Sequence, residues 1–286
     1  MNAGGSERTI RIGSTVERLL VRTWNLFHGN TQPPTRKAFL REMLRLATAD
    51  RPGVLCLQEL PVWSLARLES WSGMTAVADV TERPRIGPFP SSAELGRIIT
   101  ELNHGLFRSA FTGQANAILL APDLRVLERR HLVLNSYRFR RAQARHLGLG
   151  AAARRLWGKE RRVCQVVRVR QGDTTFVVGN LHATGSSDKR LADAELLRAA
   201  VFADGLARPA ELVLLCGDFN LSIRNSRMLA GLIEPEWGFT GPTPTGIDHV
   251  LVRGLEAGPP ERWPPERRSF EGRVLSDHAP VDREVG

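Results

Sequence analysis

The chain has 286 residues, of which 42% are hydrophobic and 24% are charged, which excludes low-complexity disorder over most of its length. A chain of this length forms one large domain or two small ones, and it can bury a sizeable core. The formal net charge of +10 excludes an acidic protein and points to a negatively charged partner.

The N-terminal residues 1–15 are polar, and we expect a flexible segment there, followed by a single domain over residues 16–286. This segment lacks the apolar core of a signal peptide, and no hydrophobic run approaches the length of a membrane span. Cys56, Cys164 and Cys216 lie inside apolar runs without metal-binding spacing, which predicts buried, reduced thiols. We therefore expect a cytoplasmic monomer that makes no stable association with membranes.

Short apolar runs recur along the chain and predict a protein rich in β-strands. Helical periodicity is limited to residues 35–49 and 188–206, whereas the Arg-rich residues 141–160 suit either a helix or a loop. The Pro-rich residues 259–265 predict a surface loop. Because strands and helices do not alternate strictly, two packed sheets with outer helices fit better than a doubly wound parallel sheet. The runs expected to be strands are RLLVRTW, VLCLQEL, TAVADV, NAILLA, RVLERRHLVL, VCQVVRVR, TTFVVGNLHA, ELVLLCGDF, IDHVLVRG and RVLSDHAPV.

One segment, residues 125–170, accounts for the basic character of the chain. It carries 14 Lys and Arg residues against two acids, Glu128 and Glu160. Such a segment suits a polyanionic partner such as nucleic acid or an anionic lipid surface. It suits a solvated arginine-rich surface equally well, because charge alone does not choose a partner.

Polar and ionisable residues lie at the ends of several of these apolar runs. In the sequence CGDFN, Asp218 and Asn220 are two residues apart, so their side chains point to the same side of an extended chain. Each such residue alone suits a turn or a surface position. Together, acids, amides and two histidines at separate strand ends indicate a site for a hard cation. The residues in this group are Asn25, Glu59, His182, Asp218, Asn220, Asp248, Asp277 and His278.

Several motifs, in this order along residues 19–283, resemble those of the endonuclease/exonuclease/phosphatase superfamily with the deoxyribonuclease I-like fold. The motifs are TWNLFHG, LQE, GNLHATG, GDFN, GIDHVLV and SDH. LQE alone has low specificity for the family, and GDFN after a hydrophobic strand has a higher one. The complete set of motifs, in this order, is a strong match and spans nearly the whole chain. The resemblance implies an α/β (α+β) four-layer sandwich, in which two mixed β-sheets pack face to face with helices on the outer faces.

The resemblance also implies a metal site that uses divalent cations. Glu59 matches the principal Mg²⁺ carboxylate of the family, Asn25 the amide beside it, and Asp277 a further acid near the metal. This set agrees with Mg²⁺ chemistry, because Mg²⁺ keeps several waters and takes only one or two protein carboxylates. A closed Zn²⁺ site would need Cys or more His residues. Mn²⁺ is expected to substitute for Mg²⁺, and His28 is assigned no role.

The catalytic residues implied by the resemblance are those of a phosphodiesterase. His278 matches the histidine that contacts the scissile phosphate, and Asp248 the acid that orients and charges it. Asp218 and Asn220 match the pair that positions the nucleophilic water and the phosphate, and His182 matches the second histidine. Two histidines offer general acid and base groups on both sides of the phosphorus, and a buried acid fixes the tautomer of its histidine.

The substrate is predicted from charge, because the superfamily cleaves DNA, RNA, sphingomyelin and inositol phosphates with the same site. The basic segment favours a nuclease that acts on DNA, with Arg140, Arg141 and Arg145 as substrate-binding residues. Asn116 in GQANAILL either lines the site or belongs to the core. A phosphomonoesterase or a lipid or inositol-phosphate phosphodiesterase is the alternative. A non-catalytic nucleic-acid-binding module remains a further alternative, which the complete set of site residues disfavours.

Overall fold

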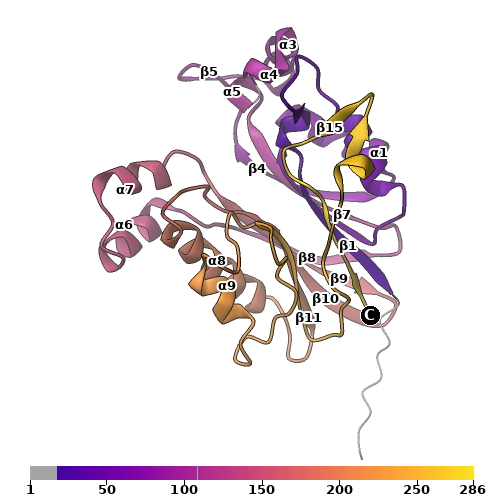
Figure 1. Ribbon diagram of the computed structural model, residues 1–286, viewed down its shortest axis with the longest axis vertical. Coiled ribbons are helices and arrows are strands. Elements are labelled where there is room, and N and C mark those ends of the chain that lie inside the picture. The colour runs from indigo at the N-terminus through magenta and orange to yellow at the C-terminus, as the bar shows by residue number, and fades with distance from the viewer. Residues whose placement is uncertain (1–17, 108) are drawn as a thin grey trace, which may run out of the picture.

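The computed structural model describes residues 18–107 and 109–286, and two large mixed β-sheets lie against each other in it (Figure 1). The expected flexible segment 1–15 lies outside the described residues. In the larger sheet β1 pairs in parallel with β3, and the other pairs are antiparallel. Its strands, in order across the sheet, are β13 (Glu261–Arg262), β16 (Val281–Val285), β1 (Leu19–Asn25), β3 (Val54–Leu60), β7 (Gln114–Leu120) and β4 (Thr75–Glu82).

The second large sheet is antiparallel except for the parallel pair of β10 and β11. Its strands, in order, are β12 (Asp248–Arg253), β11 (Leu212–Asp218), β10 (Thr174–His182), β9 (Val163–Gln171) and β8 (Arg125–Val133). Short strands form two small sheets, which are β14 (Ser269–Phe270), β15 (Arg273–Leu275) and β2 (Thr31–Gln32), and β5 (Arg85–Ile86) with β6 (Phe89–Pro90).

Helices cover the outer faces of both large sheets (Figure 1). The larger sheet is covered by α1 (Leu40–Thr48) and α2 (Leu68–Ser72), and the second by α8 (Arg190–Asp204) and α9 (Arg227–Leu232). The others are α3 (Ala93–Leu102), α4 (His104–Phe107), α5 (Ser109–Thr112), α6 (Tyr137–His146) and α7 (Ala151–Trp157), with 3-10 helices η1 (Phe27–Gly29), η2 (Val62–Arg67) and η3 (Pro265–Arg268).

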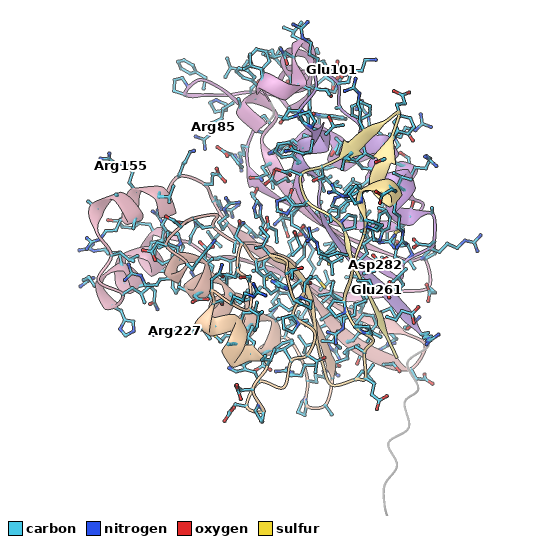
Figure 2. The ribbon with its side chains drawn as sticks, viewed as in Figure 1. Arg85, Glu101, Arg155, Arg227, Glu261 and Asp282 are labelled. Carbon is cyan, nitrogen blue, oxygen red and sulfur yellow. The ribbon has the colours of Figure 1, made fainter. Side chains whose placement is uncertain are left out.

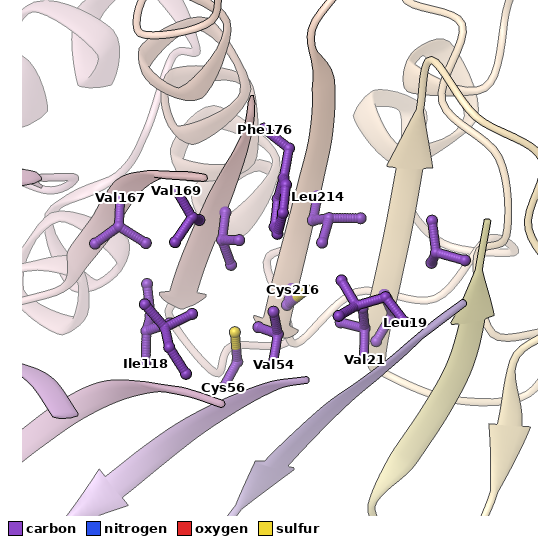
Figure 3. Close-up of a cluster of buried hydrophobic side chains, with 14 of the residues drawn as sticks. Leu19, Val21, Val54, Cys56, Ile118, Val167, Val169, Phe176, Leu214 and Cys216 are labelled. Carbon is purple, nitrogen blue, oxygen red and sulfur yellow. The ribbon is translucent and has the colours of Figure 1, made fainter. Parts of the chain in front are cut away.

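The main core fills the space between the two large sheets, and Figure 3 shows side chains from both of them meeting there. In β11, Leu214 and Cys216 face this core, whereas Val213 and Leu215 pack in the cluster under α8. This alternation follows from the period of two in a strand, and it explains why the strand is apolar on both faces. Both sheets therefore share one core, and the single domain over residues 16–286 stays a prediction.

The predicted four-layer sandwich of two mixed sheets with outer helices is confirmed. The run RVLSDHAPV, however, is not one strand: Arg273–Leu275 form β15 and Val281 begins β16, because Ser276 has a positive φ of 60° that ends the extended chain. The helix expected at 35–49 begins at Leu40, since Thr35 N–H donates to the Asn30 side chain in a loop. The Arg-rich region forms α6 and α7.

The three cysteines are buried and form no disulfide, as expected from their apolar surroundings. Across the described ranges, the helices are too short or too polar to cross a bilayer.

Candidate active site

The polar residues predicted at strand ends meet at one end of the two large sheets. Asn25 ends β1, His182 ends β10, and Asp218 ends β11 opposite Asp248, which begins β12. Side chains alternate along a strand, so residues two or four positions apart face the same way. These four residues therefore point into the space between the sheets, because each lies two or four positions from a residue of its strand that belongs to the main core. These core residues are Val21, Val178, Leu214 and Val250.

Glu59 reaches the same site through an irregularity in β3. Cys56 faces the core between the sheets, so regular alternation would turn Glu59 toward the outer helices. The pairing of β3 with β7 shifts between Leu57 and Leu60, and Glu59 has a positive φ of 55°. A bulge of this kind re-aims a side chain, and it brings the Glu59 carboxylate to Asn25.

Asn25 connects two carboxylates that come from different sheets. Its Nδ2 lies 3.1 Å from Glu59 Oε1 and 3.1 Å from Asp218 Oδ2, and it donates to both. His182 Nε2 lies 3.4 Å from Asp218 Oδ2 and 3.7 Å from Glu59 Oε1. The amide and the imidazole thus hold the two acids in one cluster at the end of the sandwich.

The GDFN segment turns sharply after β11 to place its polar groups. Gly217 has a φ of 137°, and a Cβ there would lie 1.9 Å from the carbonyl oxygen of Leu181, so only glycine fits. The Asn220 N–H donates to Asp218 Oδ1 over 2.9 Å, as in an Asx turn. Asn220 Nδ2 also donates to the Ala183 carbonyl over 3.0 Å, which ties this loop to the end of β10.

His278 lies on the loop after β15 and pairs with Asp248. Its Nδ1 lies 2.9 Å and 3.0 Å from the two carboxylate oxygens of Asp248, and its Nε2 lies 3.8 Å from Asp218 Oδ2. Ser276 Oγ accepts the His278 N–H and donates to the Asn25 carbonyl oxygen over 2.7 Å. Trp24 Nε1 donates to the His278 carbonyl oxygen. The loop is therefore fixed against β1.

The ionisable groups of the cluster have shifted pKa values that suit different roles. Burial lowers the pKa of His278, but the hydrogen bond and charge of Asp248 and the charges of Asp218 and Asp277 raise it to about 10. Burial and the charge of Asp248 raise the pKa of Asp218 to about 7. Burial and nearby positive charges lower the pKa of His182 well below its usual value. At neutral pH His278 is a cation and His182 is neutral.

The structure adds two residues that the sequence analysis did not assign to the site. His28 Nε2 lies 3.2 Å from Glu59 Oε2. Arg162 is buried, and its Nη1 lies 3.0 Å from His182 Nδ1 and 3.1 Å from His182 Nε2. Arg162 Nη2 donates to Glu160 Oε2 over 2.5 Å, so one ion pair of the basic segment reaches the cluster.

A sequence signal for Arg162 exists in the hairpin of β9 and β10. Leu181 pairs with Cys164, so the residues just before β9 must lie beside the end of β10. The positions before VCQVV could therefore have been predicted as neighbours of the GNLH motif. His28 carries no comparable signal, since its position depends on the positive φ values of Phe27 and His28 in η1.

The remaining predicted residues lie beside the cluster or on a helix outside it. Asp277 adjoins His278 and contributes to the raised pKa of that histidine. Asn116 is buried in β7, and its Nδ2 donates to the carbonyl oxygen of Val163, the residue after Arg162. The arginines predicted to bind substrate lie on α6, and no hydrogen bond or ion pair within the described residues joins them to the cluster: Arg140, Arg141 and Arg145.

The donor atoms of the cluster fit a hard divalent cation. Asp218, Asp248 and His278 offer ligand atoms within 4.8 Å of one another, but His278 Nδ1 and Asp248 already bind each other. The Glu59 side is the better fit, because the carboxylates of Glu59 and Asp218 meet there, with Asn25 Nδ2 donating to both of them. Asn116 Oδ1 is a buried acceptor without a hydrogen-bond partner in the described part of the chain. The set contains no thiolate, which excludes a closed Zn²⁺ site of the cysteine type.

The comparisons with known proteins agree with this fold. Residues 23–278 match the Endonuclease/Exonuclease/phosphatase family, so the chain belongs to that family. It is a phosphoric-ester hydrolase by that membership. A search of curated proteins finds no match.

Solved structures of the same fold cover most of the chain. An endonuclease/exonuclease/phosphatase from Bacteroides vulgatus has a TM-score of 0.66 at 12% identity, over 94% of this chain and 98% of that one. The human Nocturnin catalytic domain with bound sulfate has a TM-score of 0.61 at 14% identity, over 94% and 93%. TDP2 from Caenorhabditis elegans has 0.58 at 14%, over 94% and 74%. At these identities the likeness shows the fold.

Proposed function

We propose that this hydrolase is a divalent-metal-dependent phosphodiesterase that cleaves the phosphodiester bonds of DNA. The observation that carries the proposal is the bridge of Asn25 Nδ2 between the carboxylates of Glu59 and Asp218. A cationic His278 and a neutral His182 flank this bridge. Such a cluster combines a cation site, a base and a positive group for a phosphoryl oxygen.

Glu59, Asn25 and Asp277 are the residues that would hold the cation, with Mg²⁺ as the expected ion and Mn²⁺ as its substitute. A bound divalent ion would supply positive charge against the phosphoryl oxygens during hydrolysis. The strained φ of Glu59 is consistent with a functional position, because such backbone strain clusters at active sites.

The protein groups divide the work of hydrolysis among them. Asp218, with a pKa near 7, can accept a proton from the attacking water as the water oxygen bonds to phosphorus. The bond from phosphorus to the leaving oxygen breaks, and that oxygen takes a proton from solvent. His278, which Asp248 keeps charged, can donate a hydrogen bond to a phosphoryl oxygen. Asn220 fixes the loop that carries Asp218.

The proposal that DNA is the substrate rests on the basic segment, because residues 125–170 contain 14 Lys and Arg residues but only two acids. Arg162, which belongs to this segment, contacts His182, and this contact supports a path for an anionic chain into the site.

We also propose that the protein is a monomer and that it acts in the cytoplasm. The three buried free thiols favour a reducing compartment.

The proposal is tested by measuring hydrolysis by the purified protein in the presence of Mg²⁺ or Mn²⁺, and with a chelator as the control. The substrates are supercoiled plasmid, single-stranded DNA, RNA, sphingomyelin and an inositol polyphosphate. We expect metal-dependent DNA cleavage that His278→Ala slows by about 10²- to 10⁴-fold. Turnover of only the lipid or the inositol phosphate would keep the site and overturn the assignment of DNA. Absence of turnover on every substrate with either metal would contradict the proposed activity.

A further inference from the structure

A groove of about 460 Å³ lies between α6 and α7, the helices inserted between β8 and β9. Four arginines line it, and the segment from Arg129 to Lys159 contains no acid. Tyr137 at its edge is 69% exposed, whereas Trp157 at its floor is buried. The residues that line the groove are Tyr137, Arg140, Arg141, Ala144, Arg145, Arg154 and Trp157.

Two of these arginines are held in place before any ligand binds. Arg140 Nε donates to the Asn135 carbonyl oxygen over 2.8 Å, and Arg154 Nε donates to the Leu149 carbonyl oxygen over 2.8 Å. A Cβ on Gly158 would lie 2.1 Å from Arg140 Nη1, so the absence of a side chain there makes room for the guanidinium. Within the described residues no carboxylate pairs with the arginines of the groove, and their charge is available to an anion.

Hydrogen bonds fix the groove beside the catalytic cluster. Trp157 Nε1 donates to Glu195 Oε1 over 2.6 Å, and Glu195 Oε2 accepts the N–H of Thr184, two residues after His182. On the other side, Asn135 Oδ1 accepts the N–H of Arg162, whose Nη1 contacts His182. If a substrate strand binds with one phosphodiester at this cluster, the neighbouring nucleotides of that strand would therefore lie next to the groove.

The dimensions and the chemistry of the groove select its occupant. Its volume is that of a small-ligand pocket, about 300–1,000 Å³, and it is too small to hold a base-paired duplex. Guanidinium groups bind phosphate in bidentate fashion, and an exposed aromatic ring offers a stacking surface for an unpaired base. In Figure 2, Arg155 of α7 and Arg85 of β5 lie toward the same side of the molecule, away from Glu261 and Asp282.

We propose that the groove between α6 and α7 is a subsite for one unpaired nucleotide of a nucleic-acid strand whose scissile phosphodiester lies at His278. The phosphate of that nucleotide binds among the arginines, and its base stacks on Tyr137. This inference rests on the proposed nuclease function and restricts it, because it requires a single-stranded segment next to the cleaved bond.

Binding to the inactive His278→Ala protein tests the subsite without turnover. Fluorescence anisotropy compares a labelled single-stranded 12-mer with a blunt duplex of the same sequence. The groove variant is Arg141→Gln with Arg145→Gln. Arg140 and Arg154 bind carbonyls of the loops before α6 and α7 over 2.8 Å, whereas Arg145 Nε reaches only the Arg141 carbonyl within its own helix, over 3.4 Å. The control is Arg125→Gln with Arg170→Gln, the same charge change at the paired far ends of β8 and β9, roughly 26 Å along the strands from the end of β8 at Val133.

We expect the groove variant to weaken single-strand binding by about tenfold and to flatten the salt slope by about 1.4, whereas the control changes neither. Tyr137→Ala should weaken single-strand binding by about fivefold or more, and Tyr137→Phe should retain it. Equal losses in the groove variant and the control, or tighter binding of duplex than of single strand, would overturn the proposal. Binding to anionic vesicles but not to nucleic acid would also overturn it.

Hydrolysis distinguishes failure of the subsite from failure of the proposed function. In the otherwise native chain, the groove variant should lose kcat/KM on the oligonucleotide at least tenfold more than on bis(p-nitrophenyl) phosphate, which is too short to reach the groove. Equal losses on both substrates would contradict the subsite and leave the phosphodiesterase intact. Tight single-strand binding without hydrolysis of either substrate would contradict the proposed function and leave the subsite intact.

Discussion

The two histidines of the site differ in protonation state at neutral pH because their neighbouring side chains differ. His278 pairs with the Asp248 carboxylate over 2.9 Å, whereas His182 contacts the Arg162 guanidinium. An adjacent acid favours the imidazolium form, and burial beside a cation favours the neutral form. The same residue type therefore supplies a charged donor on one side of the cluster and a neutral ring on the other.

Replacing Asp248 tests the origin of the charge on His278. We expect Asp248→Asn to move the pKa of His278 from about 10 down toward 6.5, because the main group that raises it is lost. Activity at neutral pH should fall by about 10²- to 10⁴-fold. The pKa is measured by NMR titration of the metal-free protein, with Asp204→Asn on the exposed Arg253 pair as the control. A pKa that stays near 10 in the variant would contradict the assignment.

The raised pKa of His278 also predicts how stability depends on pH. Because the folded protein binds this proton more tightly than the unfolded chain, the contribution is complete below about pH 6.5. It is lost as the pH rises through about 10. Urea unfolding of the metal-free protein should show a larger loss of unfolding free energy over this range in the wild type than in Asp248→Asn. Parallel curves would argue against the linkage.

Glu59 is the residue whose loss should affect the cation most directly. We expect Glu59→Gln to raise the Mg²⁺ concentration for half-maximal activity by about 10- to 100-fold, because the amide removes a negative charge but keeps the shape. Isothermal titration of Mg²⁺ or Mn²⁺ into the protein measures the affinity independently of turnover. Glu236→Gln at an exposed position is the control. Unchanged metal affinity in Glu59→Gln would place the cation elsewhere.

At the scale of the element, the turn after β11 depends on a single glycine. A Cβ on Gly217 would overlap the Leu181 carbonyl oxygen of β10, and its φ of 137° disfavours other residues. We expect Gly217→Ala to lower the free energy of unfolding by about 3 kcal/mol or more, since both strain and overlap contribute. Urea unfolding measures this, with Gly231→Ala in α9 as the control, whose Cβ meets only Met228 at 3.8 Å. Equal stability of the two variants would contradict this account of the turn.

The strands carry most of what the sequence could predict. Alternation along β1, β10, β11 and β12 places Asn25, His182, Asp218 and Asp248 on the core side. The apolar runs predicted these strands and their ends but not the side, because a strand such as β11 is apolar on both faces. Glu59 was assigned from the family motif, but its orientation comes from a bulge in β3 that no local pattern indicated. The contact of Arg162 with the site needed the strand pairing of β9 and β10. The helices α6 and α7 remained ambiguous because arginine suits a helix and a solvated loop alike.

At the scale of the whole molecule, the site exists only because two sheets pack against each other. β1 and β3 of one sheet bring Asn25 and Glu59, while β10 and β11 of the other bring His182 and Asp218. The apolar side chains between the sheets fix the distance between these groups (Figure 3). The helices inserted between β8 and β9 add a cationic groove at the same end through the contacts of Trp157 and Asn135.

The most direct test of the central claim is the rate of metal-dependent hydrolysis of a single-stranded DNA oligonucleotide by the purified protein. We predict cleavage with Mg²⁺ or Mn²⁺ that a chelator stops and that added metal restores. We also predict a loss of about 10²- to 10⁴-fold in His278→Ala, with the fold unchanged by circular dichroism. Cleavage that persists in the chelator, or a His278→Ala protein with wild-type turnover, would contradict the site described here.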